Sequence, residues 1–98
     1  MVKLSVEELT EKILSGERDF SKIQLPDFSS LVYLIPTLNE YLVSQDLRTN
    51  QFSLRNSYLY GIKIPGIYLP FANMSGAYMS RANMSGAYMS RANMSGAY

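Results

Sequence analysis

The feature that most constrains this chain is a repeat of five residues in its C-terminal half. The ten residues from Ala72 to Arg81 recur without change from Ala82 to Arg91, and a third copy begins at Ala92. Each copy holds two pentads, Ala-Asn-Met-Ser-Gly and Ala-Tyr-Met-Ser-Arg. Two apolar slots, one for alanine and one for methionine, therefore recur every five residues. A fixed short period of this kind is typical of repeat architectures, whose units pack mainly against their neighbours.

The same two slots continue backwards, with larger apolar residues in place of most of the alanines and methionines. Residues two apart on an extended strand point to the same side, but an odd period would turn the next pair to the opposite side. The chain keeps every pair inside only by bending about 90° per pentad, which closes a coil in roughly 20 residues. The slots of the earlier pentads hold Phe52 and Leu54, Ser57 and Leu59, Ile62 and Ile64, and Ile67 and Leu69.

We therefore predict an all-β fold, a right-handed quadrilateral β-helix, with residues 1–98 in a single solenoid domain. The Ser-Gly and Ser-Arg pairs that end the pentads suit turns. An α-helix does not fit, because a period of five spreads the methionines around a helix. Coils stacked at strand spacing place residues 20 apart above one another. The expected outward columns are Tyr58, Tyr78 and Tyr98; Tyr68 and Tyr88 on the opposite side; Asn73 and Asn93; and Lys63 and Asn83.

These pentads resemble those of the pentapeptide-repeat proteins, whose usual unit is Ala-(Asp/Asn)-Leu-X-X. Residues 19–25 and 52–98 carry the resemblance, with methionine in place of the usual leucine. The run from Gly16 to Ser21 is similar to the segment that leads into the first coil of bacterial members. The resemblance implies the square β-helix and a bacterial source, but it implies little about activity, since a fold does not fix a function.

Residues 1–18 are predicted to form a helical cap over the open edge of the first coil. Ser5 and Glu8 have the spacing of a capping box, which starts a helix. A helix from about Val6 to Ser15 follows, and Gly16 is a natural stop. Its apolar stripe would cover the end of the solenoid, because the terminal coils of solenoids normally need caps. The stripe consists of Val6, Leu9, Ile13 and Leu14.

Residues 19–51 are expected to hold the first coil or coils, and residues 52–98 the regular ones. The early pentad pattern restarts at Ile23, with Leu25 and Phe28 in the apolar slots. This pattern is one residue out of phase with the pattern that begins at Phe52, so a slip must occur between them. Continuing the early register would bury Glu40, which is costly. We expect an irregular insertion near residues 36–45, opening with a helical turn or two at Pro36.

The composition predicts no enzyme. The chain has no cysteine and no histidine, which removes thiol nucleophiles, the commonest general base and the commonest ligands of transition metals. No nucleophile stands at a meaningful spacing from a base, and no phosphate-binding glycine loop is present. We therefore expect no catalytic residue, no cofactor and no metal. Methionine thioethers do bind Cu(I), but in a dry lumen without an access route we interpret them as core packing.

The predicted function is a scaffold that binds a protein partner through a flat outer face. Tyrosine offers a rigid amphipathic surface that is suited to interfaces. The alternative is that the rings only stack along the coils and shield the backbone. The candidate interaction face consists of Tyr58, Tyr78, Tyr98, Tyr68 and Tyr88.

Three further alternatives remain. The first is a structural solenoid segment that forms a homodimer through its C-terminal coil, or that continues past Tyr98, where the repeat stops midway. The remoter ones are binding of DNA gyrase, which some pentapeptide-repeat proteins achieve with an acidic surface, and binding of nucleic acid. No carboxylate follows Asp46, and Arg81 and Arg91 are expected on opposite sides, so neither is favoured. Without a signal peptide or a membrane span, the expected location is the cytoplasm.

Overall fold

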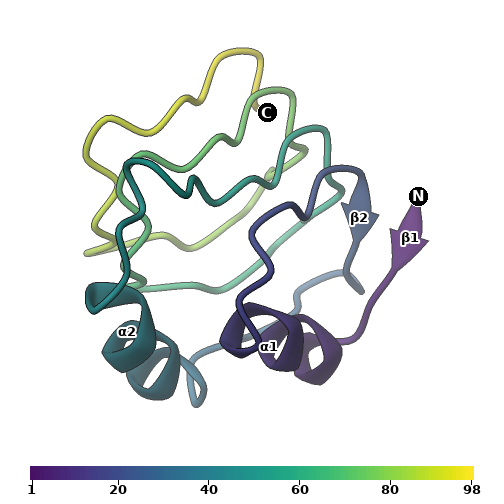
Figure 1. Cartoon of the computed structure of the whole chain (residues 1–98). Helices are drawn as coiled ribbons and strands as arrows, with labels where there is room; N and C mark the ends of the chain where they lie inside the picture. Colours follow the sequence, from purple (N-terminus) through teal and green to yellow (C-terminus); the bar gives the residue numbers. More distant parts are fainter.

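The structure, a computed structural model, describes residues 1–98 and consists of stacked turns of chain that rest on two helices (Figure 1). The regular elements are β1 (Val2–Lys3), α1 (Val6–Leu14), β2 (Ile23–Gln24) and α2 (Ile35–Val43). β1 and β2 pair in parallel. The two helices lie side by side at one end of the stack, and the C-terminus lies at the other (Figure 1). The expected all-β class is met only in part, because each helix contains nine residues.

Isolated parallel bridges join the coils, and from Ser53 onward they connect equivalent positions of successive coils. Each bridge is held by two backbone hydrogen bonds; at the first, the Leu54 N–H donates to the Asn73 carbonyl over 2.8 Å and the Asn73 N–H donates to the Phe52 carbonyl over 2.9 Å. The predicted stacking of each pentad on the fourth pentad before it is confirmed. The bridged pairs are Ser53 and Asn73, Tyr58 and Tyr78, Lys63 and Asn83, Tyr68 and Tyr88, and Asn73 and Asn93.

Every pentad from Phe52 onward ends in the same tight turn. The N–H of the residue that opens a pentad donates to the carbonyl three positions earlier, as from Ala77 to Met74 over 3.1 Å. The residue just before the opening one has a positive φ, between 57° and 72° along the series. A positive φ at the third position defines a type II turn and favours glycine. Glycine occupies that position in Gly61, Gly66, Gly76, Gly86 and Gly96, whereas Asn56, Phe71, Arg81 and Arg91 occupy it in the other pentads.

The inward slots form one apolar core that opens gradually toward the last coil. The paired slots from Phe52 to Met79 are all at most 6% exposed. Met84 and Met89 are partly buried against this core, and Met94 is 40% exposed. Burial of the paired slots is the main stabilising term for the coils, since area removed from water is the dominant favourable contribution to folding.

The N-terminal helix has the predicted start. Ser5 Oγ accepts a hydrogen bond from the Glu8 N–H over 3.1 Å, and Glu8 Oε1 accepts one from the Ser5 N–H over 3.0 Å, which is a capping box. Leu9 and Ile13 are buried. The helix ends at Leu14, close to the expected boundary. β1 then adds a short parallel strand to the free edge of β2, so the first coil is covered by both elements.

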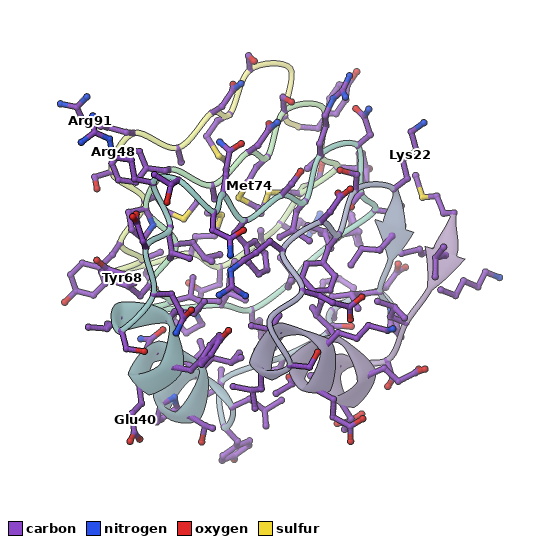
Figure 2. All side chains as sticks on the ribbon, viewed as in Figure 1. Lys22, Glu40, Arg48, Tyr68, Met74 and Arg91 are labelled. Atoms are coloured by element: carbon purple, nitrogen blue, oxygen red, sulfur yellow. The ribbon has the colours of Figure 1, made fainter.

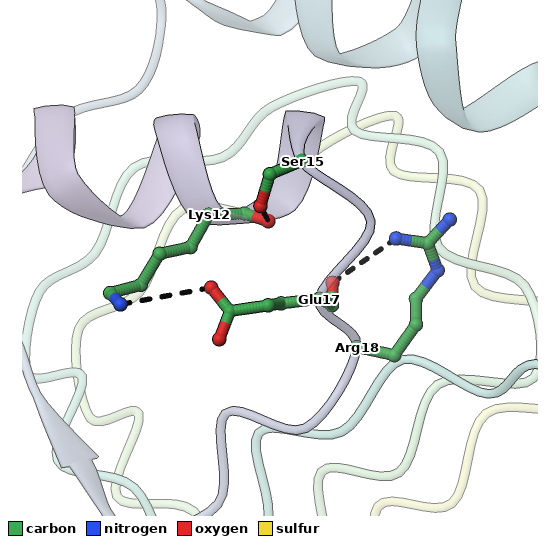
Figure 3. Close-up of polar contacts among 4 residues, drawn as sticks. All are labelled: Lys12, Ser15, Glu17 and Arg18. Carbon is green, nitrogen blue, oxygen red and sulfur yellow. Dashed lines mark hydrogen bonds and ion pairs between the residues drawn. The ribbon is translucent and has the colours of Figure 1, made fainter.

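A short polar segment connects α1 to the first coil (Figure 3). The Ser15 hydroxyl donates to the Lys12 carbonyl over 2.8 Å, and Lys12 forms an ion pair with Glu17 at 3.7 Å. Arg18 is buried, and its guanidinium donates to the Glu17 carbonyl over 3.1 Å. Arg18 also donates to the hydroxyl of Tyr41 over 2.9 Å, which links this segment to α2.

The first coil corrects one prediction. Phe28 was expected in an apolar slot, but it is 52% exposed and has a φ of 58°, as a pentad end does. The bridge partners explain the error, because Gln24 pairs with Tyr58 whereas Ser30 pairs with Lys63. The interval between the two bridges is therefore longer by a single residue in the first coil than in the coil above it. Ser29 and Leu31 take the buried slots instead of Phe28.

The segment predicted as an irregular insertion is a regular helix, and it replaces the fourth side of the first coil. α2 begins at Ile35 with Pro36 in its first turn, where proline is tolerated. Its Leu38 and Leu42 are fully buried. Asn39 takes the role of a strand: its side-chain amide donates to the Gly66 carbonyl over 2.8 Å and accepts from the Tyr68 N–H over 2.8 Å. The backbone edge above α2 is thereby satisfied.

Candidate interaction face

The column of Tyr58, Tyr78 and Tyr98 forms as predicted, and its rings touch. The rings of Tyr58 and Tyr78 are stacked, with centroids 5.3 Å apart and planes 13° apart. The rings of Tyr78 and Tyr98 lie 6.0 Å apart with a tilt of 48°. The side chains become more exposed along the column, from a half-buried Tyr58 through 37% at Tyr78 to 75% at Tyr98.

Two aromatic residues that sequence reasoning missed extend this column sideways. The Tyr60 ring stacks on Tyr78 at 5.8 Å, and the Phe28 ring meets Tyr60 edge-on at 5.2 Å. Tyr60 follows Tyr58 by two positions, so strand alternation alone placed both on the same side. Phe28 carried no such signal, because the extra residue of the first coil hides its position. We call the set of Phe28, Tyr58, Tyr60, Tyr78 and Tyr98 the aromatic face.

Tyr68 and Tyr88 lie half a coil away from the aromatic face and form a smaller pair. Their ring centroids are 6.0 Å apart with a tilt of 49°. Tyr88 is 62% exposed, whereas Tyr68 is half-buried above α2 (Figure 2). The five tyrosines predicted as candidate site residues therefore occupy two separate surfaces, as their spacing indicated.

The outward asparagines have a local role that the tyrosines lack. Asn73 Oδ1 accepts from the Ser75 N–H over 3.0 Å and from the Ser75 hydroxyl over 2.7 Å. Asn83 and Asn93 do the same with the serines two positions later. These bonds are Asx turns, which support the bend at the end of the pentad. The same slot in the aromatic face is filled by rings, which make contacts with one another across the coils.

Charges lie at the margin of the aromatic face. A hydrogen bond with the carboxylate of Asp27 raises the pKa of the Tyr58 phenol above its usual value. The basic residues do not gather. Ser80 and Ser90 accept hydrogen bonds from Gly61 and Phe71, which places the neighbouring Arg81 and Arg91 in corner columns half a coil apart. Arg91 is seen at the corner of the coils far from Lys22 (Figure 2).

Concave space is limited and lies elsewhere. The larger cavity, of about 170 Å³, lies between β1, α1 and the first coil. Neither helix is long and apolar enough to cross a membrane. The cavity is lined by Val2, Leu4, Lys12, Glu17, Asp19, Phe20, Ser21 and Ile23.

Stacked pentads with two inward slots, a turn at the end of every pentad and bridges between successive coils define a repeat protein of the solenoid class. Comparison with known families agrees: residues 66–98 match the family model described as pentapeptide repeats (8 copies). The chain is therefore a pentapeptide-repeat protein, and the predicted resemblance is confirmed over that segment. A search of the curated proteins found no match to this chain.

Proposed function

We propose that residues 52–98 form a right-handed quadrilateral β-helix, and that this solenoid is a non-enzymatic scaffold that binds a protein partner through the aromatic face. The observation that carries the proposal is the run of five aromatic rings in mutual contact on one side of the coils. Tyrosine and phenylalanine are enriched at protein interfaces, because their rings bury much area at low cost in side-chain entropy.

A protein partner fits this surface better than a nucleic acid. Binding of nucleic acid depends on lysine and arginine near the phosphates. The aromatic face has no lysine or arginine among its members, and the carboxylate of Asp27 lies beside Tyr58. Phe28 supports a binding role too, since a bulky exposed residue at a positive φ is a strained choice that the coil itself does not require.

The test compares two sets of substitutions that remove tyrosines from different sides. The variant Tyr58→Ser/Tyr78→Ser/Tyr98→Ser strips the aromatic face, and Tyr68→Ser/Tyr88→Ser strips the opposite side as a control. Each immobilised protein is used to capture partners from an extract of the source cells, and bound proteins are identified by mass spectrometry. We expect a protein that the wild type and the control capture and that the triple variant loses. Equal capture by all three proteins would show that the aromatic face is not the binding site.

The last coil favours a second candidate function, self-association. Met94 is 40% exposed there, and the backbone N–H groups of Met84, Gly86 and Met89 donate to no other backbone group. A second copy stacked on this coil would cover the apolar slots and pair the free edge. Light scattering over a range of concentrations tests this candidate: we expect dimers that Met94→Lys weakens. A mass that stays monomeric at high concentration would rule it out.

A further inference from the structure

The methionines of the last coil carry an inference that is independent of the aromatic face. In this coil, which spans residues 79–98, every side has methionine at its central inward slot. The coil beneath carries Leu59, Ile64, Leu69 and Met74 at the same slots, and all four are at most 2% exposed. Since the bridges place each pentad over the equivalent pentad of the coil beneath, the four methionines of the upper coil lie around the same axis. They are Met79, Met84, Met89 and Met94.

We propose that these four methionines bind one soft monovalent metal ion, Cu(I) or its analogue Ag(I), through their thioether sulfurs. Four neutral sulfur donors around one axis suit such an ion, because soft thioether ligands select Cu(I). The methionine side chain is unbranched and flexible, so the sulfurs can turn toward a common centre without moving the backbone. Figure 2 shows Met74, the methionine of the coil beneath, inside the coils.

The charge of the site sets which ions it takes. No carboxylate follows Asp46 in the sequence, and no three His, Cys, Asp or Glu side chains come together anywhere in the protein. A divalent ion such as Mg²⁺ or Ca²⁺ needs oxygen ligands and charge compensation, and the lumen supplies neither. A single positive charge that is bound by polarisable sulfur costs less to desolvate, so we expect discrimination against divalent ions.

The exposure of the methionines provides a route to the sulfurs. Met74 is fully buried and Met79 is 6% exposed, whereas Met94 is 40% exposed. The sequence favoured core packing for these residues because a closed lumen gives an ion no access. In the structure the last coil is the part of the lumen that solvent reaches. The adjacent inward slots hold only alanine, which leaves the longer methionine side chains room to rearrange.

The test uses Ag(I) in chloride-free buffer, with binding followed by calorimetry and by native mass spectrometry of the full chain. We expect one Ag(I) per chain, no binding of Mg²⁺ or Ca²⁺, and loss of the ion in Met79→Leu/Met84→Leu/Met89→Leu/Met94→Leu. Leucine suits this variant, because Leu59 and Leu69 already fill the same slots of the coil beneath. Met74→Leu is the matched control: it removes a methionine from the lower coil, and it should keep binding.

Two results would overturn the proposal. One is a wild-type protein that binds no Ag(I), and the other is a folded quadruple variant that binds it as well as the wild type does. X-ray absorption at the copper edge, with Cu(I) added to the wild type under anaerobic conditions, keeps the proposal testable if the quadruple variant does not fold. A first shell of sulfur alone is expected; a shell of oxygen or nitrogen would contradict the site.

Discussion

Residues 52–98 and residues 1–51 build their buried layers by different means. In the later region each side of a coil is a pentad, and its backbone pairs with the equivalent pentad of the neighbouring coil. In the earlier region the coil has an extra residue after Gln24, and a helix takes the place of its fourth side. The comparison teaches that the period specifies the coil wherever it is kept, whereas closing the end of the solenoid requires contacts that no period encodes.

The largest expected effect compares equal truncations in the two regions. Leu69→Ala removes a buried side chain from a coil, and Leu38→Ala removes one from α2; their exposures are 1% and 0%. Each should lower the free energy of unfolding by about 2–5 kcal/mol, because a cavity is added to the lost burial. Urea denaturation followed by circular dichroism measures both. A small loss for Leu38→Ala alone would mean that α2 is only loosely attached to the coils.

The next prediction concerns the helix that stands in for a strand. Asn39→Ala leaves the Gly66 carbonyl and the Tyr68 N–H without their partner. The cost should be about 1–3 kcal/mol, as expected for buried backbone groups left unpaired. Asn83→Ala is the control, because it removes an exposed Asx turn and should cost less. If the two losses are equal in urea denaturation, α2 does not replace the missing side of the coil.

A smaller effect, of opposite sign, is expected at the corners of the coils. Arg81 has a φ of 63°, which costs a residue with a side chain about 1–2 kcal/mol. Arg81→Gly should raise the melting temperature, since relief of this strain exceeds the added entropy of the unfolded chain, about 0.4–1 kcal/mol. Gly86→Ala is the reverse experiment at an equivalent corner, where a Cβ would meet no atom within 4 Å. It should lower the melting temperature through backbone strain alone, and an increase would contradict the turn geometry.

The smallest effect separates the two regions by pH. The pKa values of three carboxyl groups are lowered by hydrogen bonds: Glu8 by the Ser5 backbone, Asp19 by Ser21 and Asp46 by Thr49. A lowered pKa stabilises the folded state above the ordinary values of 4.5 for Glu and 3.8 for Asp, and this contribution is lost as the pH falls through the lowered values. Hydrogen exchange at acid pH should therefore loosen residues 1–51 first. Earlier loosening of residues 52–98, which hold no carboxylate side chain, would contradict this account.

The sequence predicted the parts of the fold that depend on local pattern. Pentad spacing gave the columns of Tyr58 and Tyr68, and the capping box at Ser5 gave the start of α1. Phe28 was misplaced, because one extra residue shifts every later position and leaves no local trace. The role of Asn39 was also invisible, since both of its partners lie far along the chain. For the same reason only part of the aromatic face was sought correctly: Tyr60 was accessible to alternation, whereas Phe28 required the structure.

Spin labels test the stacking of successive coils most directly, because the chain contains no cysteine of its own. Nitroxide labels are attached to the pair Tyr68→Cys/Tyr88→Cys, which a bridge joins, and to the pair Tyr78→Cys/Tyr88→Cys, which is half a coil apart. Paired strands lie about 4.8 Å apart, so the first pair should show strong spin exchange and the second pair none. Exchange in the second pair, or its absence in the first, would contradict the coiled arrangement on which the proposed functions depend.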